Sequence, residues 1–287
     1  MTTVLTPVGV NLLGYVETPE MGDHPYLIDV DGAPYVPVGD CGVVLGVRLG
    51  DSVFAHDADH AAPGVTLVHP DPAARHGLTA FSCLGNEAVV RDGAAAGAVG
   101  RVLGKRGEAG RVVVVFGDDV LARLAPGDAV MVRGMGQGAQ PPDLQAAGVQ
   151  LLNTDAGILS RLGVGVGDRV SLGVRTCLPS QVVGNGIGRP ADMWDVDLTL
   201  TAESLATWTP RLLLGDLVAV EDLDVRHNIG YRRGWVTVGV VVHGGSPLPG
   251  HGPGLMPMLC GPRDAFDLRV DAVDHTGVTP DLLGLNP

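Results

Sequence analysis

The segment His56-Asp57-Ala58-Asp59-His60 places two imidazoles and two carboxylates within five residues. Imidazole nitrogens and carboxylate oxygens are ligands for Zn, Fe or Mn. On a helix, His56 and His60 would lie one turn apart on the same face. The segment instead stands between two strand-like runs and leads into Pro63-Gly64. We therefore expect a loop in which Asp59 and His60 bind a divalent metal, with a solvated acidic turn as the alternative.

Two further histidines lie at and just after the end of the apolar run Trp235–His243. His243 ends this run, and His251 lies in Gly250-His251-Gly252, where small neighbours leave an imidazole accessible. An unperturbed imidazole titrates near neutral pH, so His251 is a candidate general acid or base and His243 a third metal ligand. The alternative is that His243 caps the strand and His251 bonds a backbone carbonyl.

Aromatic and basic side chains precede the same run, between Arg226 and Trp235. Guanidinium groups bind carboxylates and phosphates in a bidentate manner. We expect these side chains, together with an amide from an earlier turn, to bind substrate: His227, Tyr231, Arg232, Arg233 and Asn86.

The turn Ser82-Cys83-Leu84-Gly85-Asn86-Glu87 brings a thiol close to an amide and a carboxylate. A reactive thiol needs a cation or a helix N-terminus beside it, and neither is evident nearby, so Cys83 is best interpreted as a small buried side chain. It remains an alternative nucleophile. Glu87 precedes an apolar run, and a partly buried carboxylate is a candidate general base, with a salt bridge to Arg as the alternative.

These residues must be positioned by short β-strands, because runs rich in Val, Ile and Leu alternate with turn residues along the chain. The motif Gly-Asp-x-Val recurs at Gly50–Val53, Gly127–Val130, Gly167–Val170 and Gly215–Val218. Glycine adopts positive φ in such turns, and Asp bonds nearby backbone N–H groups. We predict a mainly β fold, a barrel or sandwich, with a few short peripheral helices.

Two lobes are expected, although one continuous domain is also compatible with the sequence. The first covers residues 1–134 and includes an SH3-like hairpin unit at 91–116, and the second covers residues 143–287 with the His- and Gly-rich loops. The Gly/Gln/Pro-rich stretch between them is the candidate linker. Exposed strand edges favour a homo-oligomer.

Composition excludes several classes of partner. The chain has 32 acidic and 19 basic residues, a formal net charge of -13, which disfavours nucleic acid. It has neither a leader-like segment nor an apolar run of membrane-spanning length, so we expect a cytoplasmic protein without a membrane partner. The glycine triplets near residues 134 and 184 do not join a strand to a helix, which argues against a nicotinamide or nucleotide site.

Three passages resemble the DUF4438 family of bacterial and archaeal proteins: Ala58–Val65, Cys83–Ala88 and the stretch from Arg232 through Gly250-His251-Gly252-Pro253-Gly254 to Cys260-Gly261. The resemblance implies a β-rich fold and no established reaction. The Gly-Asp turns are distantly similar to acetamidase/formamidase-like β-folds, an analogy of fold that does not transfer function.

We therefore expect a small-molecule enzyme: a hydrolase or related C–N bond enzyme acting on a small amide, with cyclic amides among the candidates. A divalent ion held by Asp59, His60 and His243 would lower the pKa of water and polarise the carbonyl. Glu87 or His251 would move the proton, and Arg232 or Arg233 would hold an anionic group. The alternatives are a metal-free cyclase or lyase using Cys83 and His251, and a ligand-binding protein without turnover.

Overall fold

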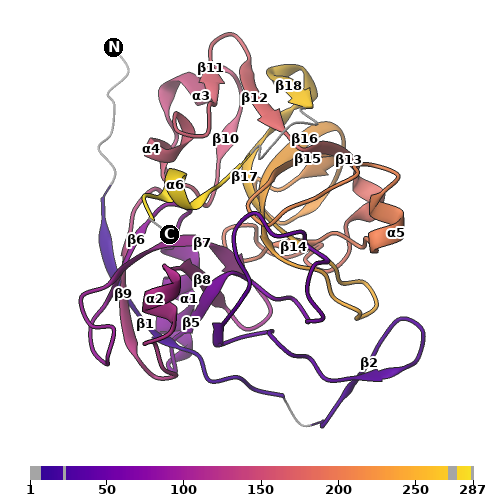
Figure 1. Cartoon of the computed structure of the whole chain (residues 1–287). Coiled ribbons are helices and arrows are strands. Elements are labelled where there is room, and N and C mark those ends of the chain that lie inside the picture. The colour runs from indigo at the N-terminus through magenta and orange to yellow at the C-terminus, as the bar shows by residue number, and fades with distance from the viewer. Residues whose placement is uncertain (1–7, 22–23, 271–276, 286–287) are drawn as a thin grey trace.

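The computed structural model describes residues 8–21, 24–270 and 277–285 of the chain. The fold is mainly β, as predicted, and its helices have four to ten residues. Figure 1 shows the strands of the N-terminal half gathered below and those of the C-terminal half above and to the right. In the described part of the chain, no helix has the length and hydropathy needed to cross a lipid bilayer.

The N-terminal strands form a closed six-stranded barrel in the order β1-β9-β6-β7-β8-β5, because β5 also pairs with β1. A short strand, β4 (Val43–Val44), extends the sheet beyond β5. The barrel strands are β1 (Val10–Val16), β5 (Gly64–Val68), β6 (Glu87–Val90), β7 (Val99–Arg106), β8 (Arg111–Val115) and β9 (Ala129–Gly134). The hairpin expected within residues 91–116 is β7–β8, two adjacent staves of this barrel.

Strand β8 explains how the barrel joins the rest of the molecule. Successive side chains of a strand point to opposite faces. Val112 and Val114 belong to the core inside the barrel. Val113 and Val115 belong to a second core, which also contains Val240 of the C-terminal sheet. This Val-rich strand is therefore buried on both faces, and the two sheets share a continuous apolar contact.

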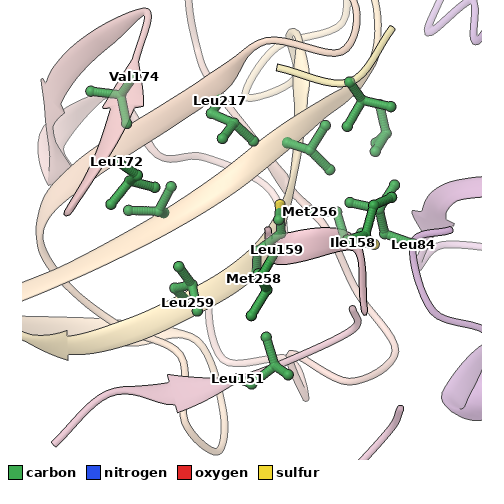
Figure 2. Packing of buried hydrophobic residues seen from close by; sticks show 14 of the residues in the cluster. Leu84, Leu151, Ile158, Leu159, Leu172, Val174, Leu217, Met256, Met258 and Leu259 are labelled. Carbon is green, nitrogen blue, oxygen red and sulfur yellow. The ribbon is translucent and has the colours of Figure 1, made fainter. Parts of the chain in front are cut away.

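The C-terminal sheet has the order β10-β17-β16-β15-β13, with β14 also paired to β17. Its strands are β10 (Gln150–Leu151), β13 (Thr176–Pro179), β14 (Val196–Asp197), β15 (Leu217–Asp224), β16 (Gly230–His243) and β17 (Gly254–Pro262). Figure 2 shows Met256 and Met258 of β17 packed beside Ile158 and Leu159 of helix α4 (Ala156–Leu159).

Smaller elements surround these two sheets. A three-stranded sheet contains β11 (Gly165–Val166), β12 (Val170–Val174) and β18 (Phe266–Val270), and a projecting hairpin contains β2 (Leu27–Ile28) and β3 (Pro34–Tyr35). The remaining helices are α1 (Pro72–Phe81), α2 (Asp118–Leu121), α3 (Pro142–Ala146), α5 (Ala202–Leu205) and α6 (Pro280–Leu283). Short 3-10 turns occupy Ser180–Val182 and Arg263–Ala265.

The repeated Gly-Asp turns form by one mechanism at three of their four positions. Gly50, Gly127 and Gly215 have φ values of 94°, 92° and 93°. In each, the following Asp accepts a hydrogen bond from the backbone N–H three residues before it, as Asp128 does from Ala125. The fourth glycine, Gly167, is not among the residues with positive φ.

Candidate functional site

Three histidines from distant segments meet where the tip of the β7–β8 hairpin approaches the C-terminal sheet. Nε2 of His60 lies 3.0 Å from Nδ1 of His251. The ring centroids of His60 and His243 are 5.1 Å apart. His60 and His243 are buried, at 3% and 1% exposure. The two His-containing loops therefore converge with the end of β16, as the sequence led us to expect.

His60 is held from behind by an acidic side chain. Its Nδ1 lies 2.6 Å from Oδ1 of Asp59, although that oxygen has no well-directed hydrogen-bond donor among the described residues. The Tyr35 hydroxyl donates to the other oxygen of Asp59, at 3.0 Å. Burial opposes ionisation of Asp59, but His60 outweighs it and lowers the pKa of that carboxyl. This arrangement leaves Nε2 of His60 facing the cluster.

The backbone of His60 adds a second observation. Its φ is 49°, in the left-handed region that residues with a β-carbon occupy at a cost. Its N–H donates to the carbonyl of Gly245, which links this loop to the segment after β16. Such conformations gather at functional sites, where the surrounding structure holds them in place.

The register of the C-terminal sheet positions a second group of side chains. Gly254, the first residue of β17, pairs with His243 on β16 and with Asp197 on β14. Asp197 is the last residue of β14, and Asp195 lies two residues earlier in the chain, directly before that strand. Nε2 of His243 lies 2.9 Å from Asp195 Oδ2 and 3.4 Å from Asp197 Oδ1. Burial works against the imidazolium of His243, but the hydrogen bond to Asp195 prevails and raises the pKa.

The cluster consists of two overlapping groups of potential ligands. In the outer group, His60, Asp197 and His251 each offer an atom, and these atoms lie within 4.8 Å of one another. In the inner group, Asp195, Asp197 and His243 satisfy the same limit. Asp197 belongs to both, and its hydrogen bond raises the pKa of His251.

The tip of the β7–β8 hairpin adds charged side chains behind the outer group. Arg106 and Arg111 lie 2.7 Å and 3.2 Å from the carboxylate of Asp40. Arg111 also lies 2.8 Å from the carboxylate of Glu17. Burial disfavours the charge on Asp40, but the two guanidinium groups lower its pKa overall. Glu108, on the turn itself, lies 3.4 Å from Nδ1 of His251.

A pocket of about 390 Å³ opens beside the outer group. His251 forms part of its wall, together with apolar side chains such as Phe54 and Leu200, hydroxyls such as Ser246, and the side chains of His56 and Asp57. Among the described residues that line it, there is neither a Lys nor an Arg. The pocket is therefore suited to a small ligand that carries little negative charge.

Glu87, expected to act as a base, does not join this cluster. Its carboxylate lies between Arg133 and Arg101, at 3.3 Å and 3.7 Å, on the barrel strand β6. These contacts are the salt bridge to Arg that was the alternative to a catalytic role for Glu87. The apolar residues that follow Glu87 form the barrel wall rather than an active-site wall.

Cys83 is fully buried and does not meet His251. Its Sγ lies 3.6 Å from the side-chain oxygen of Gln137, and its backbone N–H donates to Asn86. Burial raises the pKa of the thiol to about 11. Cys83 is therefore a protonated core side chain at neutral pH.

The predicted substrate-binding residues also lie apart from the cluster. The side chain of Asn86 is engaged with backbone groups of Met135. Arg232 pairs with Asp224 and lies over the ring of Trp235, 4.3 Å from its centroid. His227, Tyr231 and Arg233 are exposed. His227 lines a different pocket, of about 310 Å³.

Sequence reasoning missed the carboxylates that connect the histidines: Asp40, Glu108, Asp195 and Asp197. The alternation Asp195-Val196-Asp197 inside a strand-like run could have indicated two carboxylates on one face. Asp40 and Glu108 are isolated turn residues in the sequence, and only the folded chain brings them to the cluster.

The protein is a mainly β protein in which a closed barrel is joined to a second β-sheet. A His/Asp cluster lies at the junction of the two. The chain belongs to the DUF4438 family: the model of its N-terminal domain of unknown function matches residues 26–160, and that of the C-terminal domain matches residues 161–275. The crystal structure of TM1086 has the same fold, with 30% sequence identity and a TM-score of 0.89. The match covers 94% of this chain and 95% of that chain. No curated protein matches the sequence.

Proposed function

We propose that this protein is a metal-dependent hydrolase that cleaves a C–N bond in a small amide. The observation that carries the proposal is the outer group: ligand atoms of His60, Asp197 and His251 lie within 4.8 Å of one another, and His251 also lines the pocket of about 390 Å³. A divalent ion between them would stand at the wall of a cavity of substrate size.

The spacing of the outer group supports a metal ion. Nδ1 of His251 lies 3.0 Å from Asp197 Oδ2, and Nε2 of His60 lies 3.9 Å from the same oxygen. In a tetrahedral zinc site, bonds of ~2.0–2.2 Å separate the ligand atoms by about 3.3–3.6 Å. The observed separations bracket that range. Metal-binding histidines are commonly oriented by a carboxylate on the other ring nitrogen, the position that Asp59 has behind His60.

The reaction would divide its tasks between the ion and the surrounding side chains. The ion would polarise the amide carbonyl and lower the pKa of a bound water. Glu108 lies beside the outer group with 37% of its side chain exposed, and is assigned the transfer of the water's proton to the leaving nitrogen. The described residues that line the pocket include the carboxylate of Asp57 and no Lys or Arg, which favours an uncharged amide, linear or cyclic, over one that carries a carboxylate.

The test is an assay of the purified protein loaded with Zn²⁺, Mn²⁺ or Fe²⁺ against linear amides and five- and six-membered cyclic amides. We expect metal-dependent hydrolysis that His60→Ala abolishes. The matched control is His76→Ala, at an exposed histidine on α1. Retained metal and retained hydrolysis in His60→Ala would reject the proposal.

A second function is favoured by one contact. The 3.0 Å approach of His60 Nε2 to His251 Nδ1 is also a direct hydrogen bond between two imidazoles, which suits a metal-free acid–base enzyme such as a cyclase or lyase. Turnover that survives exhaustive chelation and is lost in His251→Ala would favour this function.

A further inference from the structure

We propose that the cluster binds two divalent ions rather than one, with the second ion in the inner group and Asp197 bridging the pair. This inference deepens the proposed function. It rests on that function only for the catalytic role of the ions, whereas the binding of two ions is argued from the geometry of the cluster. The inner group is Asp195, Asp197 and His243, each at most 7% exposed.

The two oxygens of Asp197 face different groups. Oδ2 lies 3.0 Å from His251 Nδ1, in the outer group, whereas Oδ1 lies 3.4 Å from His243 Nε2, in the inner group. A carboxylate with one oxygen directed to each of two ligand sets is the bridge found where two metal ions lie ~3.5–4 Å apart. Asn185 donates to Oδ2 at 3.3 Å and holds the carboxylate in this orientation.

His243 is oriented as a ligand would be. Its Nδ1 lies 2.9 Å from the carbonyl oxygen of Gly244, so the proton on that nitrogen is donated to the backbone. This contact leaves Nε2 directed at Asp195 and Asp197. A backbone carbonyl on the second ring nitrogen is a common way to fix the tautomer of a metal-binding histidine.

The backbone leaves room for the inner group at Gly254. A β-carbon at this position would lie 2.0 Å from His243 Nε2 and 2.6 Å from Asp195 Oδ2. Gly254 is paired with both His243 and Asp197 in the sheet, so the strand passes directly beside the ligand atoms. Any other residue here would occupy the space in which His243 and Asp195 approach each other.

The charge of the cluster matches two ions better than one. Six carboxylates are connected through the network and face two guanidinium groups, those of Arg106 and Arg111. The carboxylates are those of Glu17, Asp40, Asp59, Glu108, Asp195 and Asp197. With the imidazoles neutral, as metal ligands must be, four negative charges are left over, and two divalent ions would offset them.

The experiment measures stoichiometry with the metal alone. The whole protein is stripped with chelator and titrated with Zn²⁺ by calorimetry, with metal analysis after gel filtration, and with Mn²⁺ by electron paramagnetic resonance. We expect two ions per chain and an exchange-coupled Mn²⁺ pair. Asp195→Asn should retain one ion and lose the coupling, with the second affinity weakened at least about 100-fold.

Two other variants complete the design. Gly254→Ala keeps every ligand but fills the inner space, and should also bind one ion, with circular dichroism as the check on folding. Asp192→Asn, a nearby aspartate outside both groups, should bind two. One ion in the wild type, unchanged in Asp195→Asn, would overturn the bridged pair and leave the proposed hydrolase standing. Two coupled ions without hydrolysis of any amide would overturn the hydrolase and support the pair.

Discussion

Oδ1 of Asp59 lies 2.6 Å from Nδ1 of His60, so the carboxylate stands behind the imidazole, whose other nitrogen faces the cluster. The sequence pointed to these two neighbours as joint metal ligands. In the structure, only His60 faces the cluster, and Asp59 contacts the opposite side of the imidazole ring and orients it.

This relationship predicts the effect of Asp59→Asn. Loss of the supporting charge should weaken Zn²⁺ binding about 10–100-fold without abolishing it, because such partners orient the ligand rather than bind the ion. Calorimetric titration measures the change. Asp57→Asn, in the same loop but outside both ligand groups, should leave the affinity unchanged. Complete loss of the ion in Asp59→Asn would show that Asp59 is itself a ligand.

Lys105, the only lysine of the chain, predicts a pH dependence of stability. Its complete burial lowers the pKa from 10.5 to about 8. Between these values the unfolded chain binds more protons than the native state, so the free energy of unfolding rises with pH across the window. At ~1.4 kcal/mol per pH unit, the gain is about 3 kcal/mol. Below pH 8, Lys105 is charged in both the native and the unfolded state, and the native state bears the full free-energy cost of burying that charge.

The measurement is urea unfolding at several pH values between 7 and 10.5, for the wild type and for Lys105→Met. The variant loses the hydrogen bond to Asn153 but also the buried titratable amine, so its stability should change less with pH. Lysine labelled with ¹³C at Cε gives one NMR signal, which reports the titration directly. Parallel pH profiles for the two proteins would contradict the prediction.

The two Gly-Asp turns at Gly127 and Gly215 form a matched pair. Their φ values are 92° and 93°, but a β-carbon at Gly127 meets nothing within 4 Å, whereas one at Gly215 would lie 2.3 Å from the carbonyl oxygen of Val278. Gly127→Ala should cost about 1–2 kcal/mol through backbone strain. Gly215→Ala should cost about 1–3 kcal/mol more through the clash. Equal losses in chemical denaturation would show that the neighbouring segment moves freely.

Cys83→Ala tests the thiol alternative. Because burial raises the pKa of Cys83 to about 11, the side chain is a thiol at neutral pH and a poor nucleophile. We expect unchanged metal binding and hydrolysis, a stability loss of about 1 kcal/mol, and slow alkylation of Cys83 in the native protein compared with the unfolded chain. A folded variant without activity would restore the Cys83 mechanism.

The β fold was predictable because its causes are local. Alternating or continuous Val-rich runs, separated by Gly-Asp turns, produce strands such as β8 and β16 whatever the rest of the chain does. Closure of the barrel was less accessible, since it depends on the pairing of Tyr15 with Val68, far apart in the sequence. The expected strand at Val170 does form, without the positive φ expected of Gly167.

The histidines of the cluster were predictable from their unusual settings, a His-Asp loop and a Gly-bracketed imidazole. The carboxylates were not, because in the sequence Asp195 and Asp197 resemble any other aspartates, and they are buried beside His243 only through the register that places β14 next to Gly254. Glu87 and Arg232 illustrate the reverse case. Their types suited the chemistry, but each forms an ion pair with an oppositely charged residue on the neighbouring strand, Glu87 with Arg133 and Arg232 with Asp224.

At His60, the left-handed backbone conformation lowers the stability of the fold, whereas the imidazole is needed for the proposed metal site. With φ at 49°, this position favours glycine or asparagine over histidine. A search for heat-resistant variants would therefore be drawn to His60→Gly and His60→Asn, and, under the proposed function, each gain in thermal stability made there would lower the activity.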